Sequence, residues 1–320
     1  MEKKKSSRAS KIVKGILIFI AANIVIDMII TPIIYNSTFK RYDPETAVSA
    51  SQIDISEFAE LTADRQNYNF ESGKNTLNSY FYDSATDEDK ALIVFAPGMH
   101  SSSDDYLPQI EVFTENGYGV FIFDPTGSYL SEGKSEKGFE QELIDLGYAL
   151  DFCSENDNFG FDKVALFGHS RGGYSVCNIE NFGYDVDAIV SVSGIDSAMD
   201  AIMEPVADAV GDVAYINYPM LALYQMVLFG PDYVFTEAHE TLAEVDTPAL
   251  IIHGAEDEKI SLTEYSVYSY AEELADDSET EFLLSEGENG RGHSDMLFEY
   301  EDAENIELMN TVITFLDENL

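Results

Sequence analysis

The stretch "VALFGHSRGGYS" (residues 164–175) decides how this sequence is interpreted. Its first four residues are apolar, and a continuous apolar run of this length is typical of a strand covered on both faces of a parallel sheet. Ser170 follows in a turn between Gly168 and Gly172. This is the G-x-S-x-G spacing of a nucleophile elbow, in which glycines leave room for a sharp strand-to-helix turn. We therefore predict that Ser170 is a nucleophile; the alternative is an ordinary turn.

Similar short apolar runs recur along the chain and predict the fold. They span residues 91–98, 119–127, 163–170, 187–194, 248–257 and 280–288, an alternating strand pattern covers 75–84, and helical patterns lie between them. Strands that alternate with helices predict an α/β fold with a doubly wound, mostly parallel sheet. Residues 195–246 contain two apolar helical stretches and no strand pair, so we predict a helical insertion there within one domain over 63–320.

Two further side chains follow strands of the predicted sheet. Asp257 comes after the run in "LIIHGAEDEKIS" (250–261), and His293 lies in the glycine-rich "GENGRGHSDM" (287–296). The carboxyl ends of parallel strands meet at one edge, and the chain order Ser…Asp…His is typical of a triad on such a sheet. We predict that His293 is the base for Ser170 and that Asp257 orients the imidazole. A helix cap or a solvated loop acid is the alternative for Asp257 alone, and its neighbours Glu256 and Glu258 are rival acids.

An oxyanion hole is predicted in "FAPGMHSSS" (95–103), which follows the first buried run. Acyl transfer needs two backbone N–H groups directed at the developing negative charge, and we assign those of Met99 and Arg171. A plain strand-to-helix turn is the alternative. The sequence has no cysteine and histidine spacing typical of a metal site, so we expect neither a metal nor another cofactor. The two cysteines, Cys153 and Cys177, are predicted to be isolated buried thiols rather than a disulfide.

Four motifs support a resemblance to a known superfamily. They are "GHSRGG" (168–173), "IIHGAEDEKIS" (251–261), "GRGHSDM" (290–296) and "FDPTGSYLSEG" (123–133). Over roughly residues 65–320, the sequence resembles the α/β-hydrolase superfamily, in particular its monoglyceride lipases, serine aminopeptidase-like hydrolases and feruloyl esterases. The resemblance implies the same triad and oxyanion hole, and a lid at 195–246. Many members carry a histidine before the glycine of the oxyanion turn, where this sequence has Pro97.

The N-terminal segment predicts a membrane anchor. Residues 12–34 form an apolar run long enough to span a bilayer, after a basic tail over residues 1–11. Basic residues on the N-terminal side indicate a cytoplasmic N-terminus, and we therefore expect a single-pass signal anchor with the catalytic domain outside the cytoplasm. A cleaved signal peptide is the alternative. Residues 35–62 are polar and are predicted to be a linker.

Charge and motifs together predict the class of function. Residues 1–34 hold six basic and two acidic side chains, whereas the rest of the chain holds 11 basic and 58 acidic ones. So acidic a domain disfavours nucleic acid as a partner and favours a neutral or cationic small substrate. We predict a serine esterase or lipase-like enzyme that acts on a small neutral ester. A peptidase or amidase with the same triad is one alternative, and a non-catalytic binding module on a hydrolase scaffold is another.

Overall fold

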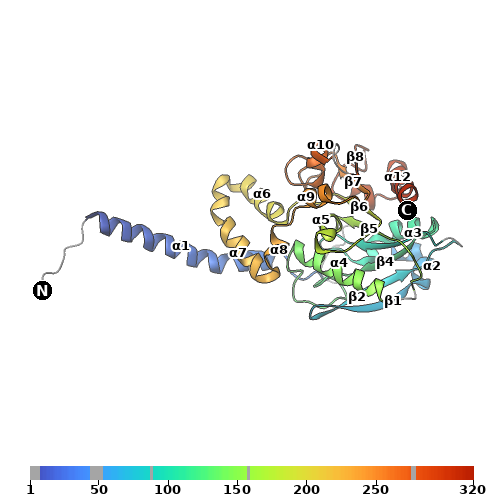
Figure 1. The fold of residues 1–320 in the computed structure, drawn as a ribbon, viewed down its shortest axis with the longest axis horizontal. Helices are drawn as coiled ribbons and strands as arrows, with labels where there is room; N and C mark the ends of the chain where they lie inside the picture. Colours follow the sequence, from blue (N-terminus) through green and yellow to red (C-terminus); the bar gives the residue numbers. More distant parts are fainter. Residues whose placement is uncertain (1–7, 44–52, 87–88, 157–158, 275–278) are drawn as a thin grey trace.

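The core of the molecule is an eight-stranded sheet (Figure 1). The computed structural model describes residues 8–43, 53–86, 89–156, 159–274 and 279–320. Its strands are β1 (Gln66–Ser72), β2 (Asn75–Tyr82), β3 (Leu92–Ala96), β4 (Gly119–Phe123), β5 (Val164–His169), β6 (Ala188–Val192), β7 (Ala249–Gly254) and β8 (Thr280–Ser285). They lie in the order β1-β2-β4-β3-β5-β6-β7-β8. Among these strands only β2 runs opposite to all the others, so the predicted mostly parallel sheet is confirmed.

The pattern of burial explains which strands the sequence reveals. Every residue of β3, β4, β6 and β7 is buried, which matches the continuous apolar runs from which these strands are predicted. The edge strand β1 has the sequence QNYNFES and exposes several of its side chains, so it carries no such run. It pairs with β2 along its whole length, from Gln66 opposite Phe81 to Ser72 opposite Asn75.

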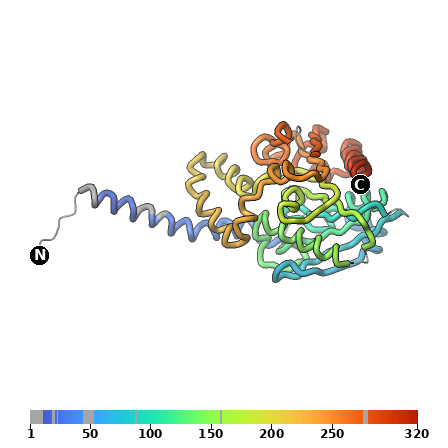
Figure 2. Tube along the Cα trace, viewed as in Figure 1, coloured from blue at the N-terminus to red at the C-terminus, as the bar shows by residue number. Residues whose placement is uncertain are grey.

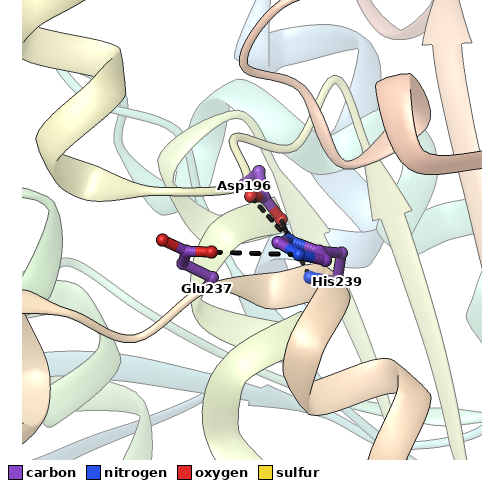
Figure 3. Close-up of side chains that lie close together, drawn as sticks. All are labelled: Asp196, Glu237 and His239. Atoms are coloured by element: carbon purple, nitrogen blue, oxygen red, sulfur yellow. Dashed lines mark hydrogen bonds and ion pairs between the residues drawn. The ribbon is translucent and has the colours of Figure 1, made fainter.

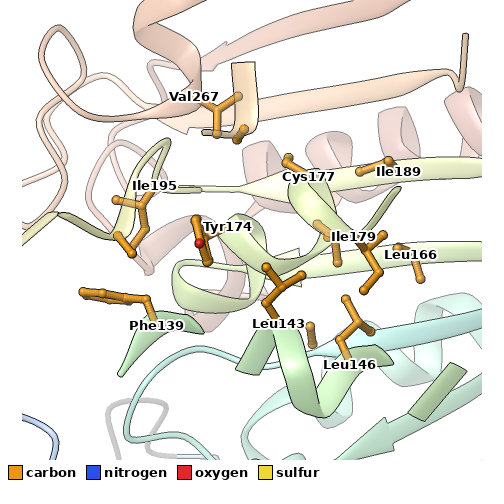
Figure 4. Packing of buried hydrophobic residues seen from close by; sticks show 14 of the residues in the cluster. Phe139, Leu143, Leu146, Leu166, Tyr174, Cys177, Ile179, Ile189, Ile195 and Val267 are labelled. Carbon is orange, nitrogen blue, oxygen red and sulfur yellow. The ribbon is translucent and has the colours of Figure 1, made fainter. Parts of the chain in front are cut away.

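Helices cover both faces of the sheet. They are α2 (Ala59–Asp64), α3 (Leu107–Glu115), α4 (Phe139–Ser154), α5 (Arg171–Asn178), α10 (Ala271–Leu274), α11 (Asp295–Phe298) and α12 (Ala303–Asn319). On one face, Leu143 of α4 and Tyr174 of α5 pack against Leu166 of β5 (Figure 4). On the other face, α3 and α12 supply side chains such as Phe113 and Val312. Short 3-10 helices complete the fold: η1 (Ile55–Phe58), η2 (Ser103–Tyr106), η3 (Ile179–Phe182), η4 (Asp212–Asn217) and η5 (Val267–Tyr270).

A helical insertion lies between β6 and β7. Its helices are α6 (Ala198–Val210), α7 (Tyr218–Phe229), α8 (Pro231–Val234) and α9 (Ala238–Glu244). The two ends of the insertion meet at its base, where Ser197 forms a β-bridge with Glu237. From there α6 and α7 extend away from the sheet toward the N-terminal helix (Figure 2).

The N-terminal helix α1 (Arg8–Thr38) corrects one prediction. Among the described residues, none of the helices combines the length and the apolar character that crossing a membrane requires, so the transmembrane helix predicted at 12–34 is wrong. Lys14 and Asp27 interrupt the apolar run, and the last turn of α1 belongs to the domain instead. Tyr35 is buried and contacts Tyr224 of α7 at a ring distance of 5.2 Å, and Phe39 is buried as well.

The remaining N-terminal boundaries stay predictions. Residues 1–7 of the expected basic tail and residues 44–52 of the expected linker lie outside the described residues. The location of the catalytic domain outside the cytoplasm likewise stays a prediction.

Candidate active site

Ser170 lies in a sharp turn between β5 and α5. Its backbone angles are φ 56° and ψ −113°, a strained combination for a residue with a side chain. The flanking glycines make the turn possible: a Cβ atom on Gly168 would lie 2.3 Å from the backbone oxygen of Gly172. A Cβ atom on Gly172 would lie 1.9 Å from the backbone oxygen of Ala96 in β3. The turn therefore needs glycine at both positions and presents the Ser170 hydroxyl at the end of the sheet.

The structure brings the three side chains of the predicted triad together. The Ser170 hydroxyl lies 2.9 Å from Nε2 of His293, and Nδ1 of His293 lies 2.8 Å from Oδ2 of Asp257. With the imidazole proton on Nδ1, the hydroxyl donates to Nε2 and Nδ1–H donates to the carboxylate. His293 is 4% exposed, so water has little access to this relay. The arrangement allows proton transfer from the hydroxyl to the imidazole.

The carboxylate of Asp257 is held by its own loop. Oδ1 accepts hydrogen bonds from the backbone N–H groups of Lys259 at 2.8 Å and Ile260 at 2.9 Å. Burial raises the pKa of Asp257, but the hydrogen bond and charge of His293 and these two N–H groups outweigh it and lower the pKa to about 2. The rival acids point elsewhere: Glu256 pairs with Arg291, and Glu258 accepts from the backbone N–H of His293.

The loop after β3 lies beside the Ser170 turn, as the predicted oxyanion hole requires. Within the described residues, neither the Met99 nor the Arg171 backbone N–H has a hydrogen-bond acceptor, so both remain free for a ligand. The preceding Gly98 N–H donates to the Tyr106 hydroxyl at 2.8 Å, and that hydroxyl lies 2.9 Å from Nδ1 of His169. The other ring nitrogen of His169 lies 3.3 Å from the backbone oxygen of His293.

Tyr106 and His169 therefore connect the oxyanion loop, the nucleophile turn and the His293 loop. Burial, together with the nearby His293, lowers the pKa of His169 to about 3, so the ring is neutral and can both accept and donate. Sequence analysis did not identify Tyr106, because one tyrosine in a helical pattern gives no sign of a hydroxyl that faces the site.

A buried cluster of charged side chains lies next to the Ser170 turn. The side chain of Arg171 is 1% exposed and donates to Glu142, and its second contact is Glu136 at 3.5 Å. Glu136 in turn accepts a hydrogen bond of 3.1 Å from the backbone N–H of His100, in the oxyanion loop. These two glutamates were not predicted, since nothing distinguishes them among the many acids of the sequence.

A cavity of about 440 Å³ opens at Ser170 and His293. Its described lining comes from the oxyanion loop, the Ser170 turn, the loops that carry Asp257 and His293 and, unexpectedly, residues 40–43 just after α1. None of its lining residues belongs to the insertion at 195–246. Some apolar side chains of that insertion, such as Leu221 of α7 and Met203 of α6, are buried in the core cluster on the α4–α5 face, whereas others, such as Ile216 and Val227, are exposed.

A second group of ionisable side chains lies at the base of the insertion (Figure 3). Nδ1 of His239 lies 2.9 Å from Oδ2 of Asp196, while Nε2 lies 3.8 Å from Glu237. Each of the three side chains offers a ligand atom within 4.8 Å of those of the other two, a spacing that could also hold a metal ion. The hydrogen bond between Asp196 and His239 joins the two ends of the insertion. Both cysteines are free and buried.

Comparisons with known proteins bear on the family and the fold. A family model described as serine aminopeptidase, S33, matches residues 87–224. The comparison with curated protein sequences finds no match. Among solved structures, an esterase from Pyrococcus furiosus is similar with a TM-score of 0.62 and 17% identity, covering 85% of this chain and 97% of its own.

Two further structures are similar at lower coverage of this chain. Est1E from Butyrivibrio proteoclasticus, with bound ferulic acid, has a TM-score of 0.57 and 17% identity over 79% of this chain and 98% of its own. An acylaminoacyl peptidase from Pyrococcus horikoshii has a TM-score of 0.56 and 18% identity over 80% of this chain and 42% of its own. The resemblance to the α/β-hydrolase superfamily is thus confirmed, and the comparisons support a hydrolase.

Proposed function

We propose that this protein is a serine hydrolase that cleaves small-molecule esters through an acyl-enzyme intermediate. The observation that carries the proposal is the unbroken relay from the Ser170 hydroxyl through His293 to Asp257, at the wall of a cavity of about 440 Å³. A serine hydroxyl is a weak nucleophile, and a neighbouring imidazole oriented by a carboxylate is the arrangement that activates it.

In the proposed mechanism, Nε2 of His293 removes the proton of Ser170 as Oγ attacks the carbonyl carbon of the ester. The tetrahedral oxyanion accepts hydrogen bonds from the N–H groups of Met99 and Arg171, and Asp257 stabilises the imidazolium. The imidazolium then protonates the leaving alcohol, which departs. Water, deprotonated by the same imidazole, attacks the acyl-enzyme and releases the acid and free Ser170.

An aminopeptidase is the second candidate, because the matching family model carries that description. Such an enzyme binds the ammonium group of its substrate, which requires an acidic side chain near the nucleophile. The described lining of the cavity holds the three cationic side chains Lys40, Arg41 and Lys259 and one acid, Asp43. This balance of charge favours an ester over a peptide with a free amino terminus.

The proposal is tested with the full chain, a fluorophosphonate probe and a 4-nitrophenyl ester. Ser170→Ala should abolish labelling and reduce kcat on the order of 10⁴-fold or more. Ser175→Ala is the matched control, since that buried hydroxyl only donates to the backbone of Arg171 in the same helix. Labelling that persists in Ser170→Ala would refute the nucleophile. Faster cleavage of aminoacyl nitroanilides than of esters would identify a peptidase instead.

A further inference from the structure

Most of the lysines and arginines after residue 34 lie around two neighbouring cavities. Eleven lysines and arginines lie between residues 35 and 320. Six of them line either the cavity at Ser170, called the catalytic cavity below, or a second cavity of about 1010 Å³. The catalytic cavity is lined by Lys40, Arg41 and Lys259. The second cavity is lined by Arg41, Lys74, Lys134 and Lys137, so Arg41 lines both.

The remaining cations are mostly neutralised by acids. Four of the other five form salt bridges: Arg65 with Asp104, Lys90 with Asp317, Arg171 with Glu136 and Glu142, and Arg291 with Glu256. By contrast, none of the six cavity cations has an acidic partner among the described residues. In a chain of net charge −43, cations without acidic partners beside the nucleophile are unusual.

The segment that carries two of these cations is fixed to the domain by its backbone. The Tyr42 N–H donates to the Gly127 oxygen at 3.0 Å, and the Tyr129 N–H donates to the Tyr42 oxygen at 3.1 Å. The guanidinium of Arg41 donates to three backbone oxygens, those of Tyr129, Ser131 and Gly133. Arg41 thus holds the loop that lines the second cavity. The side chain of Lys40 is exposed and can reach a ligand.

We infer that the ester cleaved at Ser170 is anionic and that Lys40 and Lys259 bind its negative charge at the mouth of the catalytic cavity. The inference rests on the proposed function. Net charge alone favours a neutral substrate, but charges beyond about 10 Å are largely screened at 0.1 M salt, so the lining residues dominate the field that a bound ligand meets. Asp43 is the acid they must outweigh in the described lining.

The test compares matched anionic and neutral esters on the full chain. One pair places the charge on the acyl group, as mono-4-nitrophenyl adipate against 4-nitrophenyl hexanoate. The other places it on the leaving group, as 4-acetoxybenzoate against its methyl ester. For at least one pair, kcat/KM should be higher for the anionic ester, and the advantage should shrink as sodium chloride rises from about 0.02 M to about 0.3 M.

The variants assign that preference to the two lysines. An exposed ion pair changes affinity by about two- to fivefold, so Lys40→Gln combined with Lys259→Gln should lower the ratio of anionic to neutral kcat/KM by about four- to twentyfold. Lys163→Gln is the control: it removes one positive charge at the opposite end of β5, outside both cavities, and should leave the ratio unchanged.

Each outcome separates the two proposals. Turnover of both esters without an anionic preference, or an equal fall in the ratio for Lys163→Gln, would overturn the inference while leaving the proposed hydrolase intact. Absence of turnover and of fluorophosphonate labelling would overturn the proposed function and the inference with it.

Discussion

Replacement of Asp257 by asparagine tests the proposed relay at its most constrained point. In the folded protein, Oδ1 of Asp257 accepts two backbone N–H groups, from Lys259 and Ile260, while Oδ2 faces His293. The asparagine oxygen must take the Oδ1 position, because its amino group there would face two N–H donors. Each N–H donor left without an acceptor would destabilise the folded state by about 1–3 kcal/mol. Together the two would cost more than one hydrogen bond to the imidazole contributes to stability.

The amino group of the introduced asparagine would therefore point at Nδ1 of His293 and donate to it. This forces the imidazole proton onto Nε2, the nitrogen that must accept the proton of Ser170. The wrong tautomer with unchanged geometry costs about 10⁴ in kcat, which corresponds to about 5.5 kcal/mol of activation free energy. The assay is steady-state hydrolysis of a 4-nitrophenyl ester, at a temperature where circular dichroism finds the variant folded.

Glu256→Gln is the matched control for this change. It removes one negative charge from the adjacent residue, whose side chain is 67% exposed and pairs with Arg291 at 3.4 Å. We expect its kcat to stay within about threefold of the original, since exposed ion pairs contribute little. The reasoning is refuted if Asp257→Asn retains kcat within about tenfold of the unmodified protein, or if Glu256→Gln proves equally damaging.

Three further changes follow from the same structure. Gly172→Ala places a Cβ atom 1.9 Å from the Ala96 oxygen, a backbone contact that no rotamer relieves, so both Tm and kcat should fall; an unchanged Tm would refute the steric argument. Tyr106→Phe leaves the buried Gly98 N–H without its acceptor, so the free energy of unfolding in urea should fall by about 1–3 kcal/mol and kcat by about tenfold. Burial raises the pKa of Glu140 from 4.5 to about 8, so the folded state loses stability as pH rises between these values. The free energy of unfolding of Glu140→Gln should equal that of the original protein near pH 4.5 and exceed it on the order of 2–4 kcal/mol at pH 8. A difference in unfolding free energy that does not depend on pH would contradict this reasoning.

The central part of the fold can be predicted from the sequence because both faces of its strands are buried. Such strands consist of continuous apolar residues, and the ends of these runs locate the turns that follow. Parallel strands share one carboxyl edge, so Ser170, Asp257 and His293 can be expected to meet although more than 30 residues separate each from the next. The chemical roles of these residues remain proposals until they are measured.

Other parts of the structure leave no comparable signal. The edge strand β1 is largely polar because one of its sides faces solvent. Residues 12–34 have the composition of a membrane span, but the final turn of α1 contacts α7 and the domain core through Tyr35, which hydropathy cannot reveal. Lys40 and Arg41 reach the cavity only because the segment after α1 pairs with the loop at 127–136, and that pairing joins residues about 90 positions apart in the sequence.

The charge of the chain illustrates why composition misleads about a site. A sum over residues weights every acid equally, whereas a ligand in the cavity responds to charges within about a Debye length, and more strongly to those it touches. Of the 58 acids after residue 34, only Asp43 belongs to the described lining. The buried acids directly behind it face basic groups, Asp257 the His293 imidazole and Glu136 the side chains of His100 and Arg171. The lysines at the mouth are then the charges nearest to an incoming substrate. The acidic surface would slow the encounter with an anionic ester, whereas the cations that line the cavity would bind the ester more tightly once it has entered. The preference for anionic esters should therefore appear mainly as a lower KM.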